Sequence, residues 1–339
     1  MDNPLFFRGY ITKAYSSIYT MKYLYIIIVT LALVSCNNTR VSREESEAEA
    51  TTEQYAPGTR QVKITMDLQR IASWEEYNHA IEHYWDDFDF ECGEQVVAYD
   101  TMQVMSAFAQ YASYLGAGMS AERRDSLLRN LMHRAEHSRP VFDFFTHIAE
   151  GVLHDPNSPL HNDEMYIPIL EVMVASPLLD EYDRIVPAYD LELALKNRIG
   201  EVAEDIVYTL ANGRQGRLHA IDSDYTIVMF SNPGCPMCGQ ITAEMSSSPL
   251  ISQMLASKRL TILCIYPDAD LEAWHNHHSD IPTSWINAYD KGMNITQNRT
   301  YNLAAIPSLY LLDDQKRVLI KDGYSVANIE GVIMYFEQM

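Results

Sequence analysis

The fold of this chain is decided by the stretch Tyr225–Cys238, which reads YTIVMFSNPGCPMC. Its first six residues, Tyr225–Phe230, form a continuous apolar run, which is typical of a β-strand buried on both faces of a sheet. Turn-forming residues follow, and then a C-x-x-C motif whose first cysteine is Cys235. The stretch therefore predicts a strand, a short connection and a helix that begins at the motif.

The chemistry of the motif follows from the position of Cys235 at the start of the predicted helix. Unpaired backbone N–H groups and the helix dipole favour the thiolate there, and the thiolate is the form that attacks disulfides. Pro236 fits the first helical position, where its missing N–H costs nothing. Cys238 lies one turn further on, close enough to close a disulfide. We therefore expect Cys235 to attack and Cys238 to resolve the mixed disulfide.

The segments on either side of the motif alternate between strand and helix patterns. Upstream, residues 206–210 and 217–220 indicate a hairpin around the turn Asn212-Gly213. Downstream, the pattern predicts a helix over 236–256, a strand over Leu260–Tyr266, a helical stretch around 270–290, a strand over Ser308–Leu312 that Ile306-Pro307 opens, a hairpin strand over Arg317–Lys321 and a helix at about 326–338. This order indicates an α/β domain over residues 200–339.

Residues 200–339 resemble the membrane-tethered thioredoxin-like thiol–disulfide oxidoreductases of the TlpA/ResA type. The resemblance rests on the hairpin, YTIVMFSNPGCPMC, the region from Trp285 to Tyr301 and the segment AAIPSLYLLDD, in that order. It implies an α/β thioredoxin fold and a cis Pro307 that lies against the disulfide. It also implies that a bound peptide pairs with the backbone beside Ile306.

Four positions depart from the pattern of that family. Gly234 stands where these proteins usually carry Trp or another bulky residue. Met229 replaces a buried acid of cytosolic thioredoxins, and Ile241 replaces a Glu that is common in the TlpA/ResA type, with Glu244 one turn further on. Since a buried carboxylate normally helps the resolving thiol to lose its proton, the residue with that role in this chain is unassigned.

The residues around the motif are the expected substrate contacts, namely Pro236, Met237 and Ile306. Pro236 directly after the first cysteine resembles the periplasmic oxidant DsbA, whereas Ile306 before the cis proline resembles thioredoxin. Residues at these positions tune the reduction potential over more than about a hundred millivolts across this fold. Oxidation, reduction and isomerisation of substrates therefore all stay open.

Other residues that bind metals in some proteins are interpreted as structural here. A metal-binding C-x-x-C needs two more ligands, but Cys264 falls in a buried strand and Cys92 in another domain, so both are interpreted as buried thiols. His79–His83 and His133–His137 match H-x-x-E-H, and Trp274–His278 holds three histidines. We interpret all three segments as solvated. No metal, nucleotide or flavin is implied, and the cofactor is the Cys235–Cys238 disulfide alone.

Residues 60–199 carry apolar residues at helical spacing and predict an all-α domain. Ser120 is an expected N-cap, Pro140 an expected helix start, and further helices are expected over 164–175 and about 188–198. The segments HYWDDFDF, SPLHNDEMYIPILEVMVASPLLD and LELALKNRIG resemble an uncharacterised helical domain found ahead of thioredoxin-like domains in Bacteroidota-type lipoproteins. The resemblance implies no known activity.

The N-terminus reads as a targeting signal. Residues 23–35 form an apolar run that is too short to span a bilayer and follows Lys22, as in a signal peptide. The run ends Leu33-Val34-Ser35-Cys36, which resembles the bacterial lipobox and implies lipidation of Cys36. A signal anchor with an incidental cysteine is the alternative for residues 1–36. Met21 makes a better start than Met1.

Composition and charge limit the class of protein. The 339 residues are 47% hydrophobic and carry a formal net charge of −21, which argues against a nucleic-acid partner. Residues 1–36 carry +2, residues 37–199 carry −16 and residues 200–339 carry −7. Residues 37–59 are acidic and poor in large apolar side chains, so we expect a flexible tether.

Together these features predict a lipid-anchored thiol–disulfide oxidoreductase of the cell envelope that faces the periplasm or the cell surface. Its expected partners are protein thiols and disulfides, a redox partner that the sequence does not identify, and the membrane through its lipid anchor. The competing hypothesis is a non-catalytic binding or scaffold lipoprotein with structural cysteines, whose helical domain holds a partner. The exposure of the Cys235 sulfur distinguishes the two.

Overall fold

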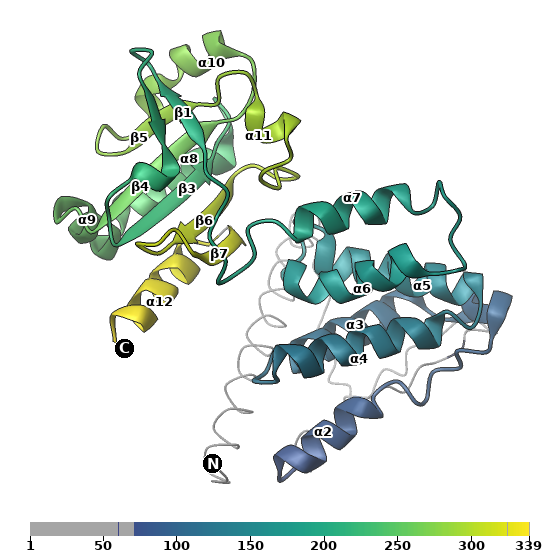
Figure 1. Ribbon diagram of the computed structural model, residues 1–339. Helices are drawn as coiled ribbons and strands as arrows, with labels where there is room; N and C mark the ends of the chain where they lie inside the picture. Colours follow the sequence, from purple (N-terminus) through teal and green to yellow (C-terminus); the bar gives the residue numbers. More distant parts are fainter. Residues whose placement is uncertain (1–59, 61–70, 324, 339) are drawn as a thin grey trace, which may run out of the picture. The chain divides into compact units, whose positions relative to one another are not determined.

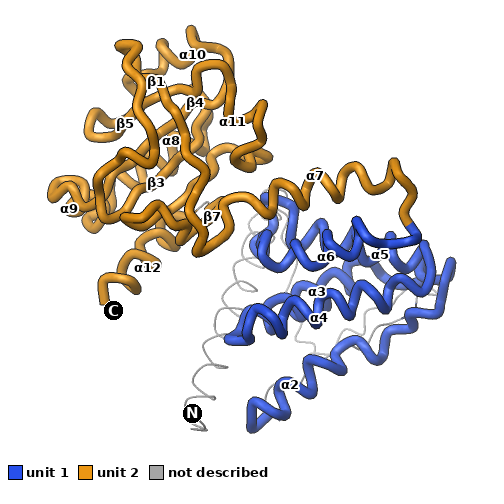
Figure 2. Tube along the Cα trace, viewed as in Figure 1, with its two compact units in different colours: residues 1–178 blue, residues 179–339 orange. Residues whose placement is uncertain are grey.

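The computed structural model describes Arg60, residues 71–323 and residues 325–338 (Figure 1). The chain divides into two compact units at residues 178 and 179 (Figure 2). The predicted signal peptide, the lipidation site at Cys36 and the tether over 37–59 lie outside the described residues. Within the described ranges, none of the helices combines the length and the apolar character needed to cross a bilayer.

The described part of the first unit is mainly helical, with one isolated β-bridge between Arg60 and Tyr99. Its helices are α2 (Trp74–Glu82), η2 (Gly93–Ala98), α3 (Thr101–Leu115), α4 (Ala121–Ala135), α5 (Arg139–Ala149), the π-helical turn η3 (Glu150–His154) and α6 (Asp163–Ala175). Ser120 caps α4 as predicted, because its Oγ accepts a hydrogen bond from the Arg123 N–H. Pro140 lies in the first turn of α5, also as predicted. The aromatic residues Trp85, Phe88 and Phe145 are buried against one another in the core.

The second unit contains one seven-stranded mixed sheet. Its strands are β1 (Val207–Leu210), β2 (Gln215–Arg217), β3 (Tyr225–Phe230), β4 (Leu260–Tyr266), β5 (Ile286–Tyr289), β6 (Ser308–Leu312) and β7 (Val318–Gly323). Their order in the sheet is β2-β1-β5-β4-β3-β6-β7. The central strand β3 runs parallel to β4 and antiparallel to β6. This arrangement, with helices on the sheet, is the predicted thioredoxin-like fold.

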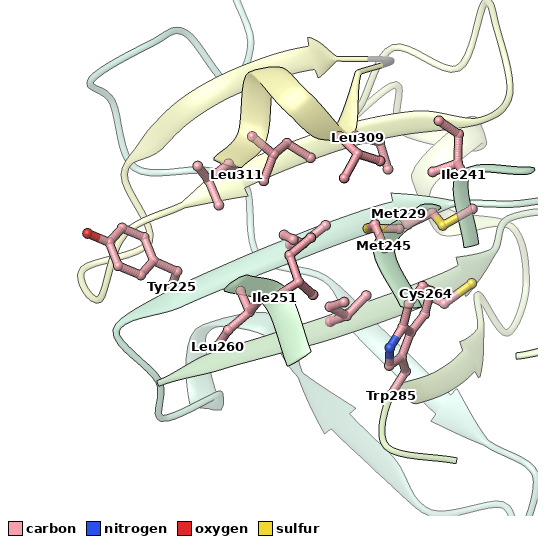
Figure 3. Packing of buried hydrophobic residues seen from close by; sticks show 14 of the residues in the cluster. Tyr225, Met229, Ile241, Met245, Ile251, Leu260, Cys264, Trp285, Leu309 and Leu311 are labelled. Atoms are coloured by element: carbon pink, nitrogen blue, oxygen red, sulfur yellow. The ribbon is translucent and has the colours of Figure 1, made fainter. Parts of the chain in front are cut away.

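The apolar run of β3 is buried on both faces, as its sequence predicts. Tyr225, Ile227 and Met229 pack against the helices α8 (Pro236–Ser247), α9 (Pro249–Ala256) and α12 (Val326–Glu337) on one face (Figure 3). Val228 and Phe230 point to the opposite face, where they pack with residues of the short helix α11 (Asn294–Gln297) and of the neighbouring strands. Alternate side chains of one strand therefore serve two hydrophobic cores.

The structure corrects three predicted elements of this unit. The hairpin strand predicted over 217–220 is β2, which ends at Arg217, and Leu218–Ala220 form the short 3-10 helix η4. The predicted helix over 236–256 is two helices, because Pro249 has no N–H to continue α8 and instead begins α9. The predicted helical stretch around 270–290 contains only α10 (Leu271–Asn276) and the turn η5 (His278–Asp280) as helix. It then forms β5, which pairs parallel to β4 and antiparallel to β1.

The second unit also begins earlier than the predicted boundary at residues 199 and 200. Helix α7 (Ile185–Ala194) belongs to it, since the Lys321 Nζ donates hydrogen bonds to the carbonyls of Ala194 and Lys196 at 2.8 Å each. The Arg299 guanidinium also forms an ion pair with Glu192 of α7 at 3.2 Å.

The segment between α7 and β1 runs along β7. The Gly200 N–H donates to the Val318 carbonyl at 2.8 Å, and the Val318 N–H donates to the Glu201 carbonyl at 2.8 Å. The Ala203 N–H donates to the Lys316 carbonyl at 2.9 Å. The chain therefore pairs with the first residue of β7 and with the turn that precedes this strand.

Candidate functional site

Cys235 lies at the junction of β3 and α8, where the sequence predicts it. It is the N-cap residue of α8, and its sulfur accepts a hydrogen bond from the Cys238 backbone N–H at 3.2 Å. The preceding Gly234 adopts a φ of 70°, which turns the chain from the strand into the helix. Cys235 is half-buried. Its sulfur therefore combines access from solvent with stabilisation of negative charge by the helix N-terminus.

Cys238 lies one helical turn later and differs from Cys235 in its surroundings. Its side chain is only 3% exposed, and both cysteines of the motif are thiols in this structure. Burial and the hydrogen bond with the Cys235 sulfur raise the pKa of the Cys238 thiol to about 11, against an opposing effect of the Ser231 and Asn232 contacts. Cys238 is therefore protonated near neutral pH.

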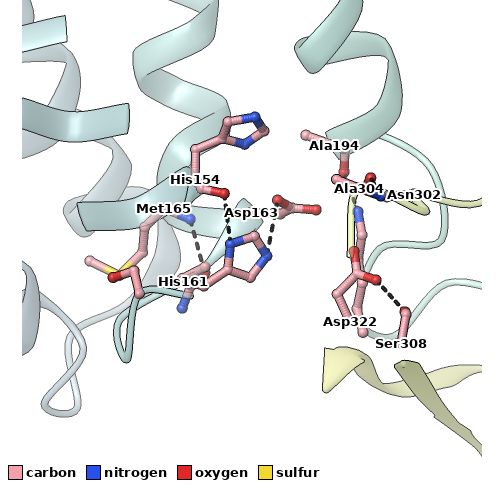
Figure 4. Close-up of polar contacts among 12 residues, drawn as sticks. His154, His161, Asp163, Met165, Ala194, Asn302, Ala304, Ser308 and Asp322 are labelled. Atoms are coloured by element: carbon pink, nitrogen blue, oxygen red, sulfur yellow. Dashed lines mark hydrogen bonds and ion pairs between the residues drawn. The ribbon is translucent and has the colours of Figure 1, made fainter. Parts of the chain in front are cut away.

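The Ile306–Pro307 peptide bond is cis, as the family resemblance implied. Strand β6 begins directly after it, and Ser308 pairs with Phe230, the last residue of β3. Because the two strands are antiparallel, Pro307 lies at the same end of the sheet as the connection that leads to Cys235. The Ser308 Oγ donates a hydrogen bond to the Asp322 Oδ1 of β7 at 2.6 Å, which ties the start of β6 to β7 (Figure 4).

The residues predicted to contact substrate present an apolar surface around the motif. Pro236 and Met237 are exposed, and the Met237 side chain is 53% accessible. Ile306 is half-buried and packs against the same hydrophobic core as Cys235. Pro236 and Met237 thus lie next to the half-buried Cys235, and Ile306 lies at the same end of the sheet.

A pocket of about 80 Å³ lies beside the motif, and we call it the cysteine pocket. It is lined by Ser231, Asn232, Pro233, Gly234, Cys235, Cys238, Gly239, Thr242, Cys264, Tyr266, Trp274, His277, Asp280, Ile281 and Asn287. Cys264, which the sequence placed only in a buried strand, therefore shares a pocket with both cysteines of the motif. Burial raises the pKa of its thiol to about 12.

His277 and Asp280 also line this pocket, although the sequence indicated only a solvated histidine segment. The His277 Nδ1 and the Asp280 Oδ2 are 2.8 Å apart. A Cβ atom on Gly234 would lie 3.6 Å from Cε1 and 3.7 Å from Nε2 of the His277 ring. The i, i+3 spacing of His277 and Asp280 indicates that the two side chains can bond to each other. The position of His277 opposite Gly234 depends on the fold and not on this spacing.

None of the three positions examined for a buried acid supplies one. Met229 and Ile241 are buried in the hydrophobic core on the α8 face of the sheet. Glu244 is exposed and accepts a hydrogen bond from the Gln240 amide at 2.9 Å. Among the described residues that line the cysteine pocket, Asp280 is the one carboxylate.

The two H-x-x-E-H segments lie in the helical unit. The Nδ1 of His83 contacts Asp86 at 2.6 Å, and the Nδ1 of His133 contacts Glu136 at 2.7 Å. Over Arg60, 71–323 and 325–338, no group of three or more His, Cys, Asp or Glu side chains has a geometry that holds a metal ion.

Comparison with known families also finds two parts of the chain, and it places the residues of α7 in the first part rather than the second. Residues 35–197 match a domain of unknown function, DUF5106, and residues 222–318 match the family described as thioredoxin-like. Human nucleoredoxin is 25% identical over 112 residues, which are 33% of this chain and 26% of that protein. The chain thus spans about a quarter of the length of this curated relative.

Solved structures extend the similarity across both units. A thioredoxin-like protein from Bacteroides caccae is 36% identical to this chain and has a TM-score of 0.75. The match covers 80% of this chain and 97% of that protein's chain. The C-terminal domain of an uncharacterized protein from Bacteroides fragilis is 39% identical, over 41% of this chain and 98% of its own, with a TM-score of 0.40. The chain therefore belongs to the thioredoxin-like family, with a DUF5106 domain ahead of its thioredoxin-like domain.

Proposed function

We propose that this protein is a thiol–disulfide oxidoreductase that exchanges disulfides with protein substrates through Cys235 and Cys238. The observation that carries the proposal is the contrast between the two thiols. Cys235 is accessible and accepts a hydrogen bond from a helix N-terminal N–H, whereas Cys238 is buried one turn behind it. An attacking thiol needs the first environment, and a resolving thiol is protected by the second.

The proposed reaction has two steps. The Cys235 thiolate attacks a substrate disulfide, a bond forms between the two sulfurs, and one substrate sulfur leaves as a thiolate. Cys238 then attacks the Cys235 sulfur, which releases the second substrate thiolate and closes the Cys235–Cys238 disulfide. The substrate gains two electrons and the protein loses two. The same steps in reverse oxidise a substrate, so the direction depends on an unidentified redox partner and not on a bound cofactor.

The apolar surface around the motif suits an extended peptide substrate. Met237 and Pro236 supply exposed apolar contacts beside the Cys235 sulfur. Ile306 precedes the cis Pro307, and both lie before Ser308, the first residue of β6 that pairs with β3. We propose that the backbone at Ile306 pairs with the substrate segment on one side of its cysteine.

Trapping of the mixed disulfide tests this function. Cys238→Ser should accumulate mixed disulfides between Cys235 and substrate proteins, which a reductant releases, because the second step is blocked. Cys235→Ser should accumulate none. Cys92→Ser, which changes a half-buried thiol of the helical unit outside the cysteine pocket, is the matched control and should behave as the unmodified protein, with no trapped adduct. Adducts that form equally with Cys235→Ser would contradict the assigned roles.

Titration against glutathione then separates catalysis from a scaffold role. An exchanging dithiol should equilibrate with glutathione within the range of known oxidoreductases. A potential below about −300 mV, together with an unreactive Cys235, is the property of a structural disulfide and would support the binding-module hypothesis.

We further propose that the protein is lipidated at Cys36 and faces the periplasm or the cell surface. The support is the segment Leu33-Val34-Ser35-Cys36 at the end of an apolar run. Cys36→Ala should move the protein out of the membrane fraction and abolish incorporation of labelled fatty acid. Unchanged labelling would contradict this site of modification.

A further inference from the structure

We propose that His277, held by Asp280, accepts the proton of Cys238 through the cysteine pocket and so takes the part that a buried carboxylate has in related proteins. The proposal rests on the proposed exchange function. His277 acts on Cys238 through the water of the pocket and touches neither the substrate nor the reacting sulfur atoms. We therefore call it a positioning residue and not a catalytic one.

The need for a proton acceptor follows from the burial of Cys238. Burial is the largest cause of the raised pKa of Cys238, and it persists when Cys235 is bonded to a substrate, so the resolving thiol is mostly protonated at pH 7. Resolution of the mixed disulfide requires its thiolate form. A general base near the thiol removes this barrier, and such bases contribute roughly a hundredfold or more to proton-transfer steps. Met229, Ile241 and the exposed Glu244 cannot supply it, for the reasons given above.

The geometry of His277 orients its ring for this task. The Nδ1 bonds to the Asp280 carboxylate at 2.8 Å, and we assign the ring proton to Nδ1 on the basis of this contact. The Nε2 then carries the lone pair. The Cε1–Nε2 edge faces Gly234, the residue before Cys235, at 3.6 and 3.7 Å from the position of an added Cβ. A bulky residue at 234 would displace the ring, so Gly234 and His277 are complementary.

Polar groups of the pocket connect the two ends of the proposed path. The Asn232 Oδ1 and the Thr242 Oγ1 are buried and have no hydrogen-bond partner among the described residues. Both residues line the pocket together with Cys238 and His277. Buried polar atoms are normally bonded to protein or to ordered water, and a volume of about 80 Å³ holds more than one water molecule. We expect such waters to carry the proton.

His277 is the pocket residue whose side-chain type changes charge between pH 5 and 8. Burial raises the pKa of Cys264 to about 12, and burial, followed by the nearby Asp268, raises the pKa of Tyr266, so both groups keep their protons in this range. Asp280 faces His277 from η5. The other charged or titratable groups on the adjoining segment are Asp268, Asp270, Glu272, His275 and His278, and none of these five lines the pocket.

The proposed step combines one proton transfer with one disulfide exchange. The proton leaves the Cys238 Sγ and reaches the His277 Nε2 through water. The Cys238 sulfur attacks the Cys235 sulfur, the bond between Cys235 and the substrate breaks, and the substrate sulfur leaves with the electron pair. The substrate thiolate then takes up a proton, and His277 returns its own to solvent, to which its side chain is 45% exposed.

Stopped-flow reaction of the reduced full-length protein with a limiting amount of 5,5′-dithiobis(2-nitrobenzoate) tests the proposal. Release of the first nitrothiobenzoate reports attack by Cys235, and release of the second reports resolution by Cys238. Cys238→Ser identifies the second phase by abolishing it. We expect His277→Gln to slow the second phase at pH 7 by about tenfold or more and to leave the first phase within about twofold.

The pH profile provides a readout that a purely structural role would not change. In His277→Gln the second-phase rate should follow the thiolate fraction of Cys238 and rise steadily with pH, whereas in the unmodified protein it should depend less on pH. The two rates should converge toward pH 10, where the thiolate forms more readily without a base. Asp280→Asn keeps a hydrogen-bonding oxygen and should give a smaller slowing in the same direction. His275→Gln, a matched change of an exposed histidine outside the pocket, should leave both phases unchanged.

The outcomes separate this proposal from the proposed function. Equal second-phase rates for His277→Gln and the unmodified protein at pH 7 would overturn the role of His277 while leaving the exchange function intact. Loss of the first phase together with the second would also overturn it, because His277 would then act on Cys235 or on the fold. If the unmodified protein shows no second phase, the proposed function itself fails.

Discussion

Gly234 illustrates how a departure from a family pattern at one residue is explained by a distant one. In the sequence it is a missing bulky side chain ahead of Cys235, with no apparent compensation. In the structure the His277 ring lies against it, and its φ of 70° belongs to a region that residues with a Cβ seldom adopt. The position therefore serves the turn and the pocket together.

We expect Gly234→Ala to lower the free energy of unfolding by about 1 kcal/mol, because the left-handed backbone costs a residue with a Cβ roughly that amount. The added methyl group meets His277 at ordinary van der Waals distance, so little steric cost is added. Gly239→Ala is the matched control, since Gly239 lies inside α8 with nothing within 4 Å of an added Cβ. It should stabilise by up to about 1 kcal/mol in urea unfolding. Equal effects of the two changes would contradict this account.

Cys264 gives a prediction on the pH dependence of stability. Because burial raises its pKa in the folded state, from 9.0 to about 12, the folded protein holds this proton more tightly than the unfolded chain. Below about pH 9 the thiol is protonated in both states, so this group does not lower the free energy of unfolding. Above about pH 9 the unfolded chain loses the proton first, and the free energy of unfolding falls by about 1.4 kcal/mol per pH unit. We expect Cys264→Ala to have a lower free energy of unfolding than the unmodified protein at pH 8. Under reducing conditions this difference should be about 1.4 kcal/mol smaller at pH 10, because only the unmodified protein is destabilised by the titration of Cys264. A deficit that is constant over this range would show that Cys264 does not titrate as described.

For individual residues, the surroundings of the C-x-x-C motif along the chain were predictable from the sequence, whereas the lining of the cysteine pocket was not. The strand before Cys235, the proline after it and the cis Pro307 are features of short segments or of a family pattern. Cys264 and His277 reach the pocket through the pairing of β3 with β4 and the path of α10, which no spacing along the chain reveals.

At the scale of elements, the division between α8 and α9 shows local chemistry setting a boundary. Ser248 ends α8 and caps α9, because its Oγ accepts a hydrogen bond from the Ile251 N–H at 3.0 Å. The same hydroxyl donates to Glu330 of α12. The helical periodicity continues across the break, which explains why one long helix was predicted.

Ser248→Ala should therefore lower the free energy of unfolding by about 1–2 kcal/mol, the usual cost of losing an N-cap. The matched control is Ser247→Ala. The Ser247 hydroxyl donates to the Glu244 carbonyl on the exposed side of α8, so this change should cost no more than about 0.5 kcal/mol. Chemical denaturation of both variants measures the difference, and a similar loss for the two would rule out the capping role.

The strands show where sequence patterns succeed. The bounds of β3, β4 and β6 agree with the predicted runs because those strands are almost wholly buried and therefore almost wholly apolar. Strand β5 was missed because only Ala288 of its four residues is fully buried. A short, partly exposed strand has too few apolar positions to show a period.

At the scale of the whole molecule, the boundary between the units has a measurable consequence. A fragment of residues 179–339 retains α7 and the two carbonyls that accept hydrogen bonds from Lys321, whereas a fragment of residues 200–339 loses them. We expect the longer fragment to fold and to keep the exchange reaction of Cys235. The shorter fragment should unfold at a lower temperature, because the Lys321 ammonium then loses its partners on α7 and after it. Circular dichroism during heating compares the two, and equal midpoints would favour the boundary at residue 200.

The DUF5106 match ends at residue 197, close to the domain boundary that the sequence predicts, whereas the contacts of α7 place this helix with the second unit. Helix α7 has the same kind of apolar and polar pattern as the helices before it, so composition assigns it to the helical domain. Its membership in the second unit depends on contacts with Arg299 and Lys321, more than 100 residues later in the chain.

The chain that runs beside β7 has a consequence for how copies of the molecule meet. An open sheet ends in two strands whose outer N–H and C=O groups are a template for association. Here β7 is bonded at its first residue, Val318, to residues 200 and 201, and the other edge strand, β2, is only three residues long and ends in Arg217. Such ends discourage edge-to-edge aggregation. If the chain exchanges disulfides with extended substrate segments, as we propose, these short or covered edges leave it little backbone through which to associate with further copies of itself.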